Sequence, residues 1–251
     1  MTDDINIAVS GAVQTLRLAR PDKKNALTAP MYDALAGALE AANGADGIAV
    51  NLVLGSPGIF CAGNDIGDFM RIAAEGGGLS APILRFLRAL ATSEKPLVAG
   101  VDGAAIGLGT TLLMHCDYVV ASSRSVFVTP FVNLGLVPEA ASSLIAPRLM
   151  GHARAFELLA MGNQMTAEAA CQAGLVNRVV EPDALEGAAN EAAAAIAAKP
   201  RRSLMMARRL IRGDPAGILE RIEAEAECFA ECLSSAEAQA AFAAFMQKGK
   251  T

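Results

Sequence analysis

The sequence predicts an α/β protein with a helical C-terminal region, and three observations support this fold class. Short runs of β-strand character alternate with runs of helical periodicity up to about residue 181, whereas the pattern from residue 182 onward is helical. Hydrophobic residues make up 53% of the 251 residues, which is enough for a sizeable core. We therefore expect a core domain over residues 1–195 and a C-terminal helical region over residues 196–251.

Hydrophobic periodicity predicts the elements in chain order. A β-hairpin of residues 5–9 and 13–18 is expected to turn at Ser10 and Gly11, and a helix over residues 30–42 follows with Thr28 as its cap. Further strands are expected at 48–54, 96–101, 118–121, 126–128 and 177–181, and helices at 65–72, 81–92 and 107–115. From Ala140 onward nearly everything else is expected to be helical, with caps at Thr166, Ser203 and Ser235.

Composition argues against several classes of protein. The formal charge of −5 speaks against nucleic acid as the main partner. The five cysteines show no CxxC spacing, so neither a disulfide framework nor a metal site is expected. The N-terminus carries Asp3 and Asp4 where a signal peptide would need basic residues, and no uncharged apolar stretch approaches the length of a membrane span. We therefore expect a cytoplasmic protein that does not enter the membrane.

Two glycine-bearing turns and one carboxylate are the strongest functional signals. The turns are FCAGNDI at residues 60–66 and DGAAIGLG at residues 102–109, and Glu139 lies in GLVPEAASS. Turns with residues as small as Gly63, Gly107 and Gly109 allow a ligand to approach the backbone closely, so that two N–H groups can point at one oxygen. A nearby base can then remove a proton from the adjacent carbon, which forms an enolate.

Each signal also has a structural explanation when it is taken alone. FCAGNDI could be a strand-to-helix turn, and DGAAIGLG could be a turn that packs a helix against a strand; its spacing is not the GxGxxG of a dinucleotide loop. Glu139 could be an N-terminal residue of the next helix, favoured there by the helix dipole. If instead Phe131, Leu134 and Leu136 surround it, its pKa is expected to be raised toward the range useful for proton transfer.

The order of four strings resembles the enoyl-CoA hydratase/isomerase (crotonase) superfamily. These strings are RPDKKNALT at 20–28, FCAGNDI at 60–66, KPLVAGVDGAAIGLGTTLLMHCDYVVAS at 95–122 and PFVNLGLVPEAASS at 130–143. The resemblance implies a crotonase-like (ClpP/crotonase) spiral of ββα units with a C-terminal helical trimerisation region. It also implies an acyl-CoA thioester substrate, with coenzyme A as part of the substrate rather than a separate cofactor, and a homotrimer or a dimer of trimers.

The resemblance also assigns site residues. The oxyanion hole is expected to consist of the backbone N–H groups of Ala62 and Leu108, with the Leu108 side chain pointing away from the thioester. The residues expected to bind substrate and coenzyme A are Lys24, Ala26, Ala62, Gly63, Asn64, Asp65, Ile66 and Gly107.

The acid–base residues decide between the reactions of the superfamily. Its hydratases hold water between two carboxylates, and the corresponding positions here are Thr111 and Phe131, neither of which can act as a carboxylate base. Glu139 resembles the single glutamate of the Δ3,Δ2-enoyl-CoA isomerases, so we expect the conversion of 3-enoyl-CoA to 2-enoyl-CoA with Glu139 as the proton shuttle. The alternatives are hydration with a rewired water site or another crotonase-type reaction, such as ring isomerisation or thioester hydrolysis, and a noncatalytic acyl-CoA-binding or RNA-associated subunit.

Other polar residues have weaker signals. His115 lies in an apolar helical run and is expected to be a packed core or interface residue, whereas His152 is expected at a helix start. Asp117 is expected to fix a turn by hydrogen bonding. Ser142 and Ser143 lack the GxSxG pattern of a hydrolase nucleophile, which argues against a Ser/His/Asp mechanism.

Overall fold

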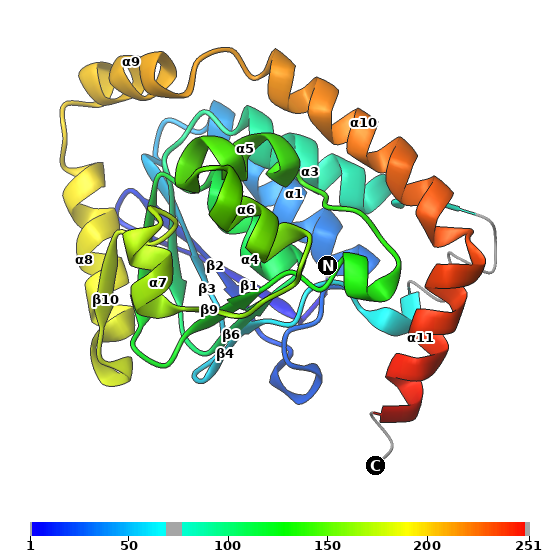
Figure 1. Cartoon of the computed structure of the whole chain (residues 1–251). Helices are drawn as coiled ribbons and strands as arrows, with labels where there is room; N and C mark the ends of the chain where they lie inside the picture. Colours follow the sequence, from blue (N-terminus) through cyan, green and yellow to red (C-terminus); the bar gives the residue numbers. More distant parts are fainter. Residues whose placement is uncertain (1, 69–76, 249–251) are drawn as a thin grey trace.

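Two β-sheets and the helices packed on them form the structure, a computed structural model that describes residues 2–68 and 77–248 (Figure 1). The larger sheet has the order β1-β2-β3-β5-β7-β10, with only the β1/β2 hairpin antiparallel. Its strands are β1 (Ile5–Ser10), β2 (Val13–Leu18), β3 (Val50–Leu54), β5 (Leu97–Val101), β7 (Tyr118–Ser122) and β10 (Arg178–Val180). The smaller sheet consists, in order, of β4 (Ile59–Cys61), β6 (Ala104–Ile106), β8 (Val126–Val128) and β9 (Met165–Thr166).

The chain alternates between the two sheets as it advances. The consecutive pairs β3/β4, β5/β6 and β7/β8 each place their first strand in the larger sheet and their second in the smaller one. A helical segment follows each pair, so the repeating unit is ββα. This arrangement confirms the predicted crotonase-like spiral, and it lays the turns after β4 and β6 side by side because those two strands pair in parallel.

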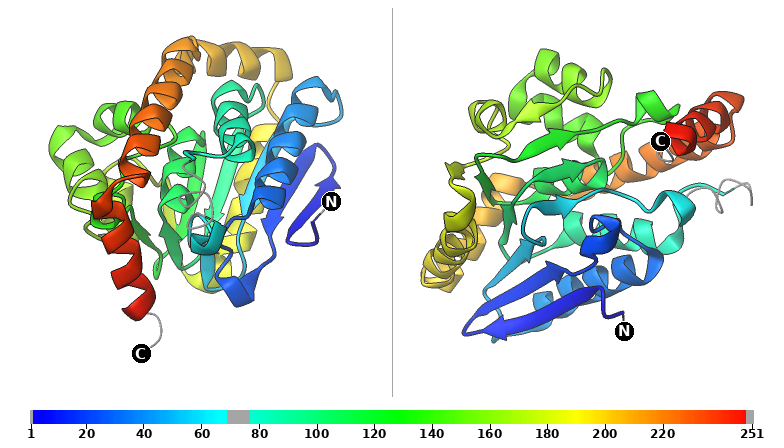
Figure 2. Two further views of the ribbon diagram at one scale, coloured as in Figure 1. Left: turned by 90° about the vertical axis from the view of Figure 1, so that its right-hand side faces the viewer. Right: turned by 90° about the horizontal axis from the view of Figure 1, so that it is seen from below.

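Helical elements occur along the whole described chain, and the last three lie on the outside of the molecule. The elements up to residue 134 are η1 (Pro21–Lys23), α1 (Ala29–Gly44), α3 (Ala81–Thr92), α4 (Leu108–Thr111), η2 (Leu112–His115) and η3 (Val132–Leu134). The later elements are α5 (Ser142–Met150), α6 (His152–Leu159), α7 (Ala167–Gln172), η4 (Pro182–Ala184), α8 (Leu185–Ala197), α9 (Arg201–Arg212), α10 (Ala216–Leu233) and α11 (Ala236–Lys248). Figure 1 shows α9, α10 and α11 as an arm around the outside of the molecule, and Figure 2 shows the same arm from two further sides.

Apolar side chains occupy both faces of the larger sheet. One face and the helices α1 and α3 enclose the main core, while α8 covers the other face through small residues such as Ala189 and Ala193. Every residue of β3 (VNLVL) is consequently buried, as expected for a parallel strand covered on both sides. No helix in the described part of the chain combines the length and the apolar character that a membrane crossing requires.

Several elements confirm the sequence analysis, and others correct it. The hairpin and the helix at 81–92 are present, and the hydroxyls of Thr166 and Ser235 cap their helices by accepting from Ala169 N–H (3.2 Å) and Ala238 N–H (3.1 Å). Ser203 is not a cap, because it lies inside α9, whose N-cap is Pro200. Residues 69–72 of the helix expected at 65–72 lie outside the described residues. The expected domain boundary falls within α8 and stays a prediction.

Three strands of the smaller sheet, β4, β6 and β9, were not predicted. They are two or three residues long and lie within or beside turn motifs, so they carry too few residues to show a periodicity. Their pairing with distant segments stabilises them as strands.

Candidate active site

The two glycine turns pack directly against each other. A Cβ atom on Gly63 would lie 2.7 Å from the carbonyl oxygen of Ile106, and one on Gly109 would lie 2.6 Å from that of Cys61. Both distances are shorter than real Cβ contacts, so only glycine allows this approach. The backbone of FCAGNDI therefore lies against the backbone at the start of α4.

Ala62 does not present a free N–H in this arrangement. Its N–H donates to the carbonyl oxygen of Lys24 at 2.9 Å and is thereby already satisfied within the protein. The prediction that the Ala62 N–H is an oxyanion donor is therefore wrong for this structure.

Asn64 has the free amide instead. It forms a parallel bridge with Leu27, in which Leu27 N–H donates to the Gly63 carbonyl (2.8 Å) and Asp65 N–H donates to the Leu27 carbonyl (3.0 Å). Because successive residues of an extended segment point their N–H groups to opposite sides, the Asn64 N–H faces away from Leu27. It has no hydrogen-bond partner among residues 2–68 and 77–248. The sequence could not separate Ala62 from Asn64, because only this pairing fixes which amide is free.

Leu108 presents the second free amide. It is the first residue of α4, where an N–H has no partner within the helix, and it has none elsewhere in the described segments. The preceding Gly107 has φ 55° and ψ −120°, a conformation open mainly to glycine, and its own N–H donates to Val128 at 2.8 Å. The Leu108 side chain is fully buried in the main core, so the amide and the side chain serve different purposes.

Glu139 is the buried carboxylate of this region. Its side chain has 0% exposure, and Oε1 accepts a hydrogen bond of 2.8 Å from the Thr111 hydroxyl. Oε2 has no hydrogen-bond partner in the described part of the chain. Burial raises the pKa of Glu139 to about 8, against a lowering by the Thr111 hydrogen bond and with a further increase from the charge of Glu225. Oε1 is thus held in place by Thr111, while Oε2 keeps its lone pairs for a proton.

The backbone around Glu139 rules out the helix-terminal explanation. Helix α5 begins only at Ser142, and the intervening Ala140 and Ala141 have φ values of 62° and 55° in the left-handed region. Glu139 therefore lies before a tight left-handed turn, not in the first turn of a helix.

The electrostatic interactions of Glu139 with Tyr32 and Cys61 indicate that it lies near the glycine turns. Burial raises the pKa values of both side chains, to about 12 for Cys61, and the nearby Glu139 charge raises them further. The Tyr32 hydroxyl donates to Asn64 Oδ1. Phe131, which was expected beside Glu139, has its ring edge 4.0 Å from the Cβ position of Gly107. Tyr32 was not predicted, because a tyrosine on the buried face of a helix has no distinct sequence signal.

The segment 20–28 braces the first turn. Arg20 Nη1 donates to Asp65 Oδ2 at 2.8 Å and to the Ala26 carbonyl at 2.9 Å. Burial tends to raise the pKa of Asp65, but Arg20 and the backbone amides of Gly67 and Asp68 outweigh it and lower that pKa. The Asp65 carboxylate therefore stabilises the turn at residues 60–66. The remaining predicted binding residues are found here too, with Lys24 exposed and Ile66 packed on the main core.

The arrangement of the two sheets and their helices is the fold that the sequence motifs predict. The sequence profile of the enoyl-CoA hydratase/isomerase family matches residues 8–251. The chain belongs to this family. Among solved structures, the chain is similar to that of OdaA from Pseudomonas aeruginosa, which is 39% identical and superimposes with a TM-score of 0.93 over 98% of this chain and 99% of that one.

Curated relatives at similar distance are named for different reactions. Enoyl-CoA delta isomerase 2 from Rattus norvegicus is 35% identical over 89% of this chain, which spans only 58% of that relative. A probable enoyl-CoA hydratase from Rhizobium meliloti is 33% identical over 97% of this chain and 95% of its own length. Similarity to family members therefore does not select one reaction.

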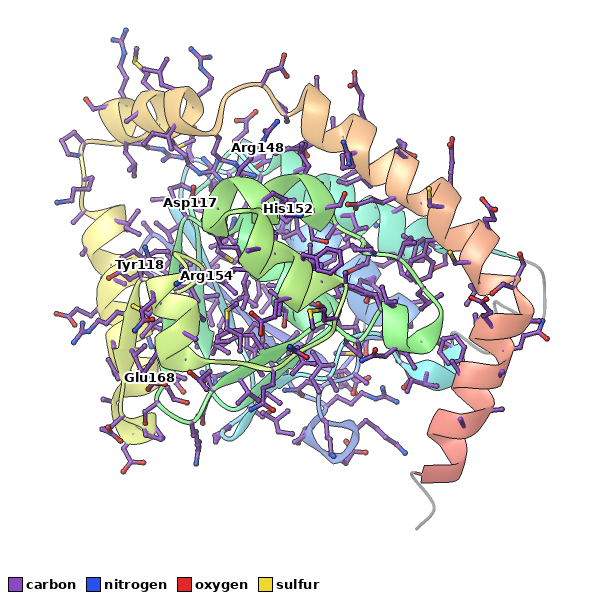
Figure 3. The ribbon with its side chains drawn as sticks, in the orientation of Figure 1. Asp117, Tyr118, Arg148, His152, Arg154 and Glu168 are labelled. Atoms are coloured by element: carbon purple, nitrogen blue, oxygen red, sulfur yellow. The ribbon has the colours of Figure 1, made fainter. Side chains whose placement is uncertain are left out.

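The remaining polar candidates have structural roles. His115 is a packed core residue, as predicted, and its Nε2 donates to the Ala140 carbonyl at 2.7 Å. Asp117 Oδ2 accepts from Leu97 N–H and Arg208 Nε, both at 2.8 Å, which confirms its structural role. His152 begins α6, as predicted, and Figure 3 shows it with Asp117 in the half of the molecule nearer α9. Among the described residues, no group of three or more His, Cys, Asp or Glu side chains is placed to hold a metal ion.

Proposed function

We propose that this protein converts 3-enoyl-CoA thioesters to 2-enoyl-CoA thioesters with Glu139 as its single acid–base residue. The observation that carries the proposal is a fully buried carboxylate that is hydrogen-bonded to Thr111 of α4 and whose Oε2 has no partner among the described residues. Two backbone amides on adjacent turns are also unpaired within that part of the chain. Free amides can stabilise a charge that develops on a thioester oxygen, and a raised pKa suits a group that must take up a proton and return it.

The reaction needs one base and no net transfer of atoms. The thioester carbonyl accepts hydrogen bonds from the Asn64 and Leu108 N–H groups, while Glu139 Oε2 removes a proton from C2. The electron pair of that C–H bond delocalises over the carbonyl and the C3–C4 double bond as a dienolate. Glu139 then delivers the proton to C4, which leaves the double bond between C2 and C3 and regenerates the carboxylate.

The site offers little support for hydration by two carboxylates. Of the two positions at which hydratases of the family carry them, Thr111 uses its hydroxyl to hold Glu139, and Phe131 is apolar. Glu225, the other buried glutamate near Glu139, has both oxygens hydrogen-bonded to residues 141 and 143 and is not available to hold water. A single carboxylate is sufficient for isomerisation, because it only moves a proton between two carbons.

The proposed substrate also determines the proposed partners. Coenzyme A enters as part of the thioester, near Lys24, Ala26 and the turns at 62–66 and 107.

A homotrimer or dimer of trimers remains our proposal for the assembly. The exposed Leu210 (82%) and Ile211 (84%) on α9 support it, because apolar side chains of this exposure suit contact with another subunit.

Parallel assays with two substrates test the proposed function. We expect 3-hexenoyl-CoA to be converted to 2-hexenoyl-CoA, and 2-hexenoyl-CoA to give little 3-hydroxyhexanoyl-CoA. Chromatography of both reactions separates the three thioesters. Rapid hydration of 2-hexenoyl-CoA without migration of the double bond in 3-hexenoyl-CoA would reject the isomerase proposal.

Replacing Thr111 with valine is expected to shift the pH dependence of the reaction. For the wild type, kcat/KM should rise with pH through an apparent pKa near 8, because only ionised Glu139 can accept the proton. The Thr111 hydrogen bond lowers the pKa of Glu139, so Thr111→Val should move this acid limb to higher pH by about one unit, the equivalent of about 1.4 kcal/mol. Initial rates between pH 6 and 10 measure the acid limb of the wild type and of Thr111→Val. An acid limb that moves to lower pH in the variant would contradict the hydrogen bond between Thr111 and Glu139.

A further inference from the structure

The turn that follows Glu139 is conformationally costly. Ala140 and Ala141 are consecutive non-glycine residues with left-handed φ values, and each such residue costs about 1–2 kcal/mol relative to a right-handed conformation. Such a turn persists only if its surroundings hold it. Since Glu139 immediately precedes the turn, whatever holds the turn also fixes the direction of the catalytic carboxylate.

Glu225 of α10 is the main side chain that holds this turn. Its Oε2 accepts the Ala141 N–H at 2.6 Å, and its Oε1 accepts the Ser143 N–H at 3.0 Å and the Ser143 hydroxyl at 2.5 Å. The side chain is 6% exposed, so water competes little for these bonds. On the other side of the turn, His115 holds the Ala140 carbonyl. The turn is thus held between η2 and a helix more than 80 residues later in the chain.

We propose that Glu225 is a positioning residue, which fixes the Ala140–Ala141 turn and thereby aims Glu139 at the substrate. The proposal rests on the role of Glu139 in the proposed function. It makes the C-terminal helical arm part of the catalytic apparatus, because α10 supplies the carboxylate that orients the base. Glu225 itself does not touch the thioester.

The groups around Glu139 predict how its pKa changes when Glu225 is replaced. The groups that act on Glu139 are the Thr111 hydroxyl, which lowers its pKa, and the Glu225 charge, which raises it. Tyr32 and Cys61 also lie near, but burial and the Glu139 charge raise their pKa values, so both are neutral at working pH. Removal of the Glu225 charge should therefore lower the pKa of Glu139.

The groups that act on Glu225 leave this prediction intact. Burial raises the pKa of Glu225 above its ordinary value, and the hydrogen bonds to Ser143 and Ala141 and the charge of Arg221 offset only part of this increase. Arg221 also donates to the Ser143 hydroxyl at 3.2 Å. Burial lowers the pKa of His115 to about 4, so this neighbour of the turn is neutral. Glu225 accepts three hydrogen bonds, as an ionised carboxylate can.

Glu225→Gln tests the proposal in the full-length protein. The amide nitrogen of glutamine cannot accept a hydrogen bond, so the turn loses at least one anchor while the side-chain volume stays the same. We expect kcat to fall by about 10- to 100-fold with KM changed less than about twofold, since a displacement of about 1 Å in a catalytic group has costs of this size. The acid limb of kcat/KM should also move to lower pH, opposite to the shift expected for Thr111→Val.

Glu223→Gln is the matched control. Glu223 lies on the same helix but is half-exposed, and its carboxylate pairs with Arg88 at 2.7 Å rather than with the turn. This variant should keep the wild-type kcat and pH profile. Equal losses in both variants, or a Glu225→Gln enzyme with wild-type kcat and acid limb, would overturn the proposal. If Glu225→Gln does not fold, Glu225→Asp keeps the charge but is too short for both anchors, and it should lose kcat with little shift of the acid limb.

A titration without substrate separates this proposal from the proposed function. The infrared band of the protonated Glu139 carboxyl can be assigned by its absence in Glu139→Gln and followed against pH. The titration midpoint should be lower in Glu225→Gln than in the wild type and unchanged in Glu223→Gln. If the wild type does not isomerise 3-hexenoyl-CoA, the proposed function fails while this midpoint still decides whether Glu225 acts on Glu139. An unshifted midpoint would reject the role of Glu225 even in an active isomerase.

Discussion

Glu139→Gln is expected to lower kcat for the isomerisation of 3-hexenoyl-CoA by about 10³- to 10⁴-fold, with a small change in KM. General acid–base catalysis contributes about 10²- to 10⁴-fold, and Glu139 would supply both proton transfers of the reaction. Glutamine keeps the volume and can still accept the Thr111 hydrogen bond, so the packing around residue 139 should stay intact. Stopped-flow or steady-state kinetics at pH 8 measures the loss, and turnover near the wild-type rate would exclude Glu139 as the base.

The same substitution should make the fold more stable at high pH. The ordinary pKa of a glutamate carboxyl is 4.5, and burial raises that of Glu139 to about 8 in the folded protein. Folding therefore favours the protonated form, so the destabilisation from Glu139 is absent below pH 4.5, grows between pH 4.5 and 8, and is complete above pH 8. Glu139→Gln removes it, and the variant should exceed the wild type by a few kcal/mol at pH 9, at about 1.4 kcal/mol per pKa unit. Denaturant unfolding at pH 5 and pH 9 tests this, and a variant less stable than the wild type at pH 9 would show that the loss of activity has a structural cause.

Leu108→Pro is expected to reduce kcat by about 10²- to 10³-fold, because it removes one donor of the oxyanion hole. Proline fits the first position of a helix, where no intrahelical hydrogen bond is lost. The preceding Gly107 has a ψ of −120°, which is compatible with a following proline because glycine also populates the mirror image of extended conformations. The side chain at 108 lies in the core, so truncating it has a cost of its own.

Leu108→Ala separates the two effects of that substitution. Alanine removes most of the same side chain but keeps the N–H, so it should lower stability while kcat stays within about tenfold of the wild type. Comparison of kcat in the two variants, with thermal unfolding of each, isolates the contribution of the amide. Equal kcat values for Leu108→Pro and Leu108→Ala would remove Leu108 from the oxyanion hole.

The sequence predicted much of the scaffold correctly, for reasons visible in particular elements. The alternation in residues 5–18 gave the hairpin, and the apolar pattern at 81–92 gave α3 with its observed bounds, because both segments are long enough to show a period. Three strands of the smaller sheet were not predicted, since β4, β6 and β9 depend on pairing with segments that are far apart in the sequence. Ser203 was mistaken for a cap because a serine within the first turn of a helix has the same local pattern.

The sequence by itself determined the family, the ββα spiral and the two small-residue turns, because motif order and glycine positions are local properties of the chain. Only the tertiary structure decided which amides are free and how Glu139 is held. The Lys24 carbonyl accepts a hydrogen bond from the Ala62 N–H, and the bridge between Leu27 and Asn64 directs the Asn64 N–H away from Leu27. Glu225 reaches the turn beside Glu139 from 84 residues further along the chain. Hydrogen bonds across such separations depend on how the chain packs, so no local pattern in the sequence records them.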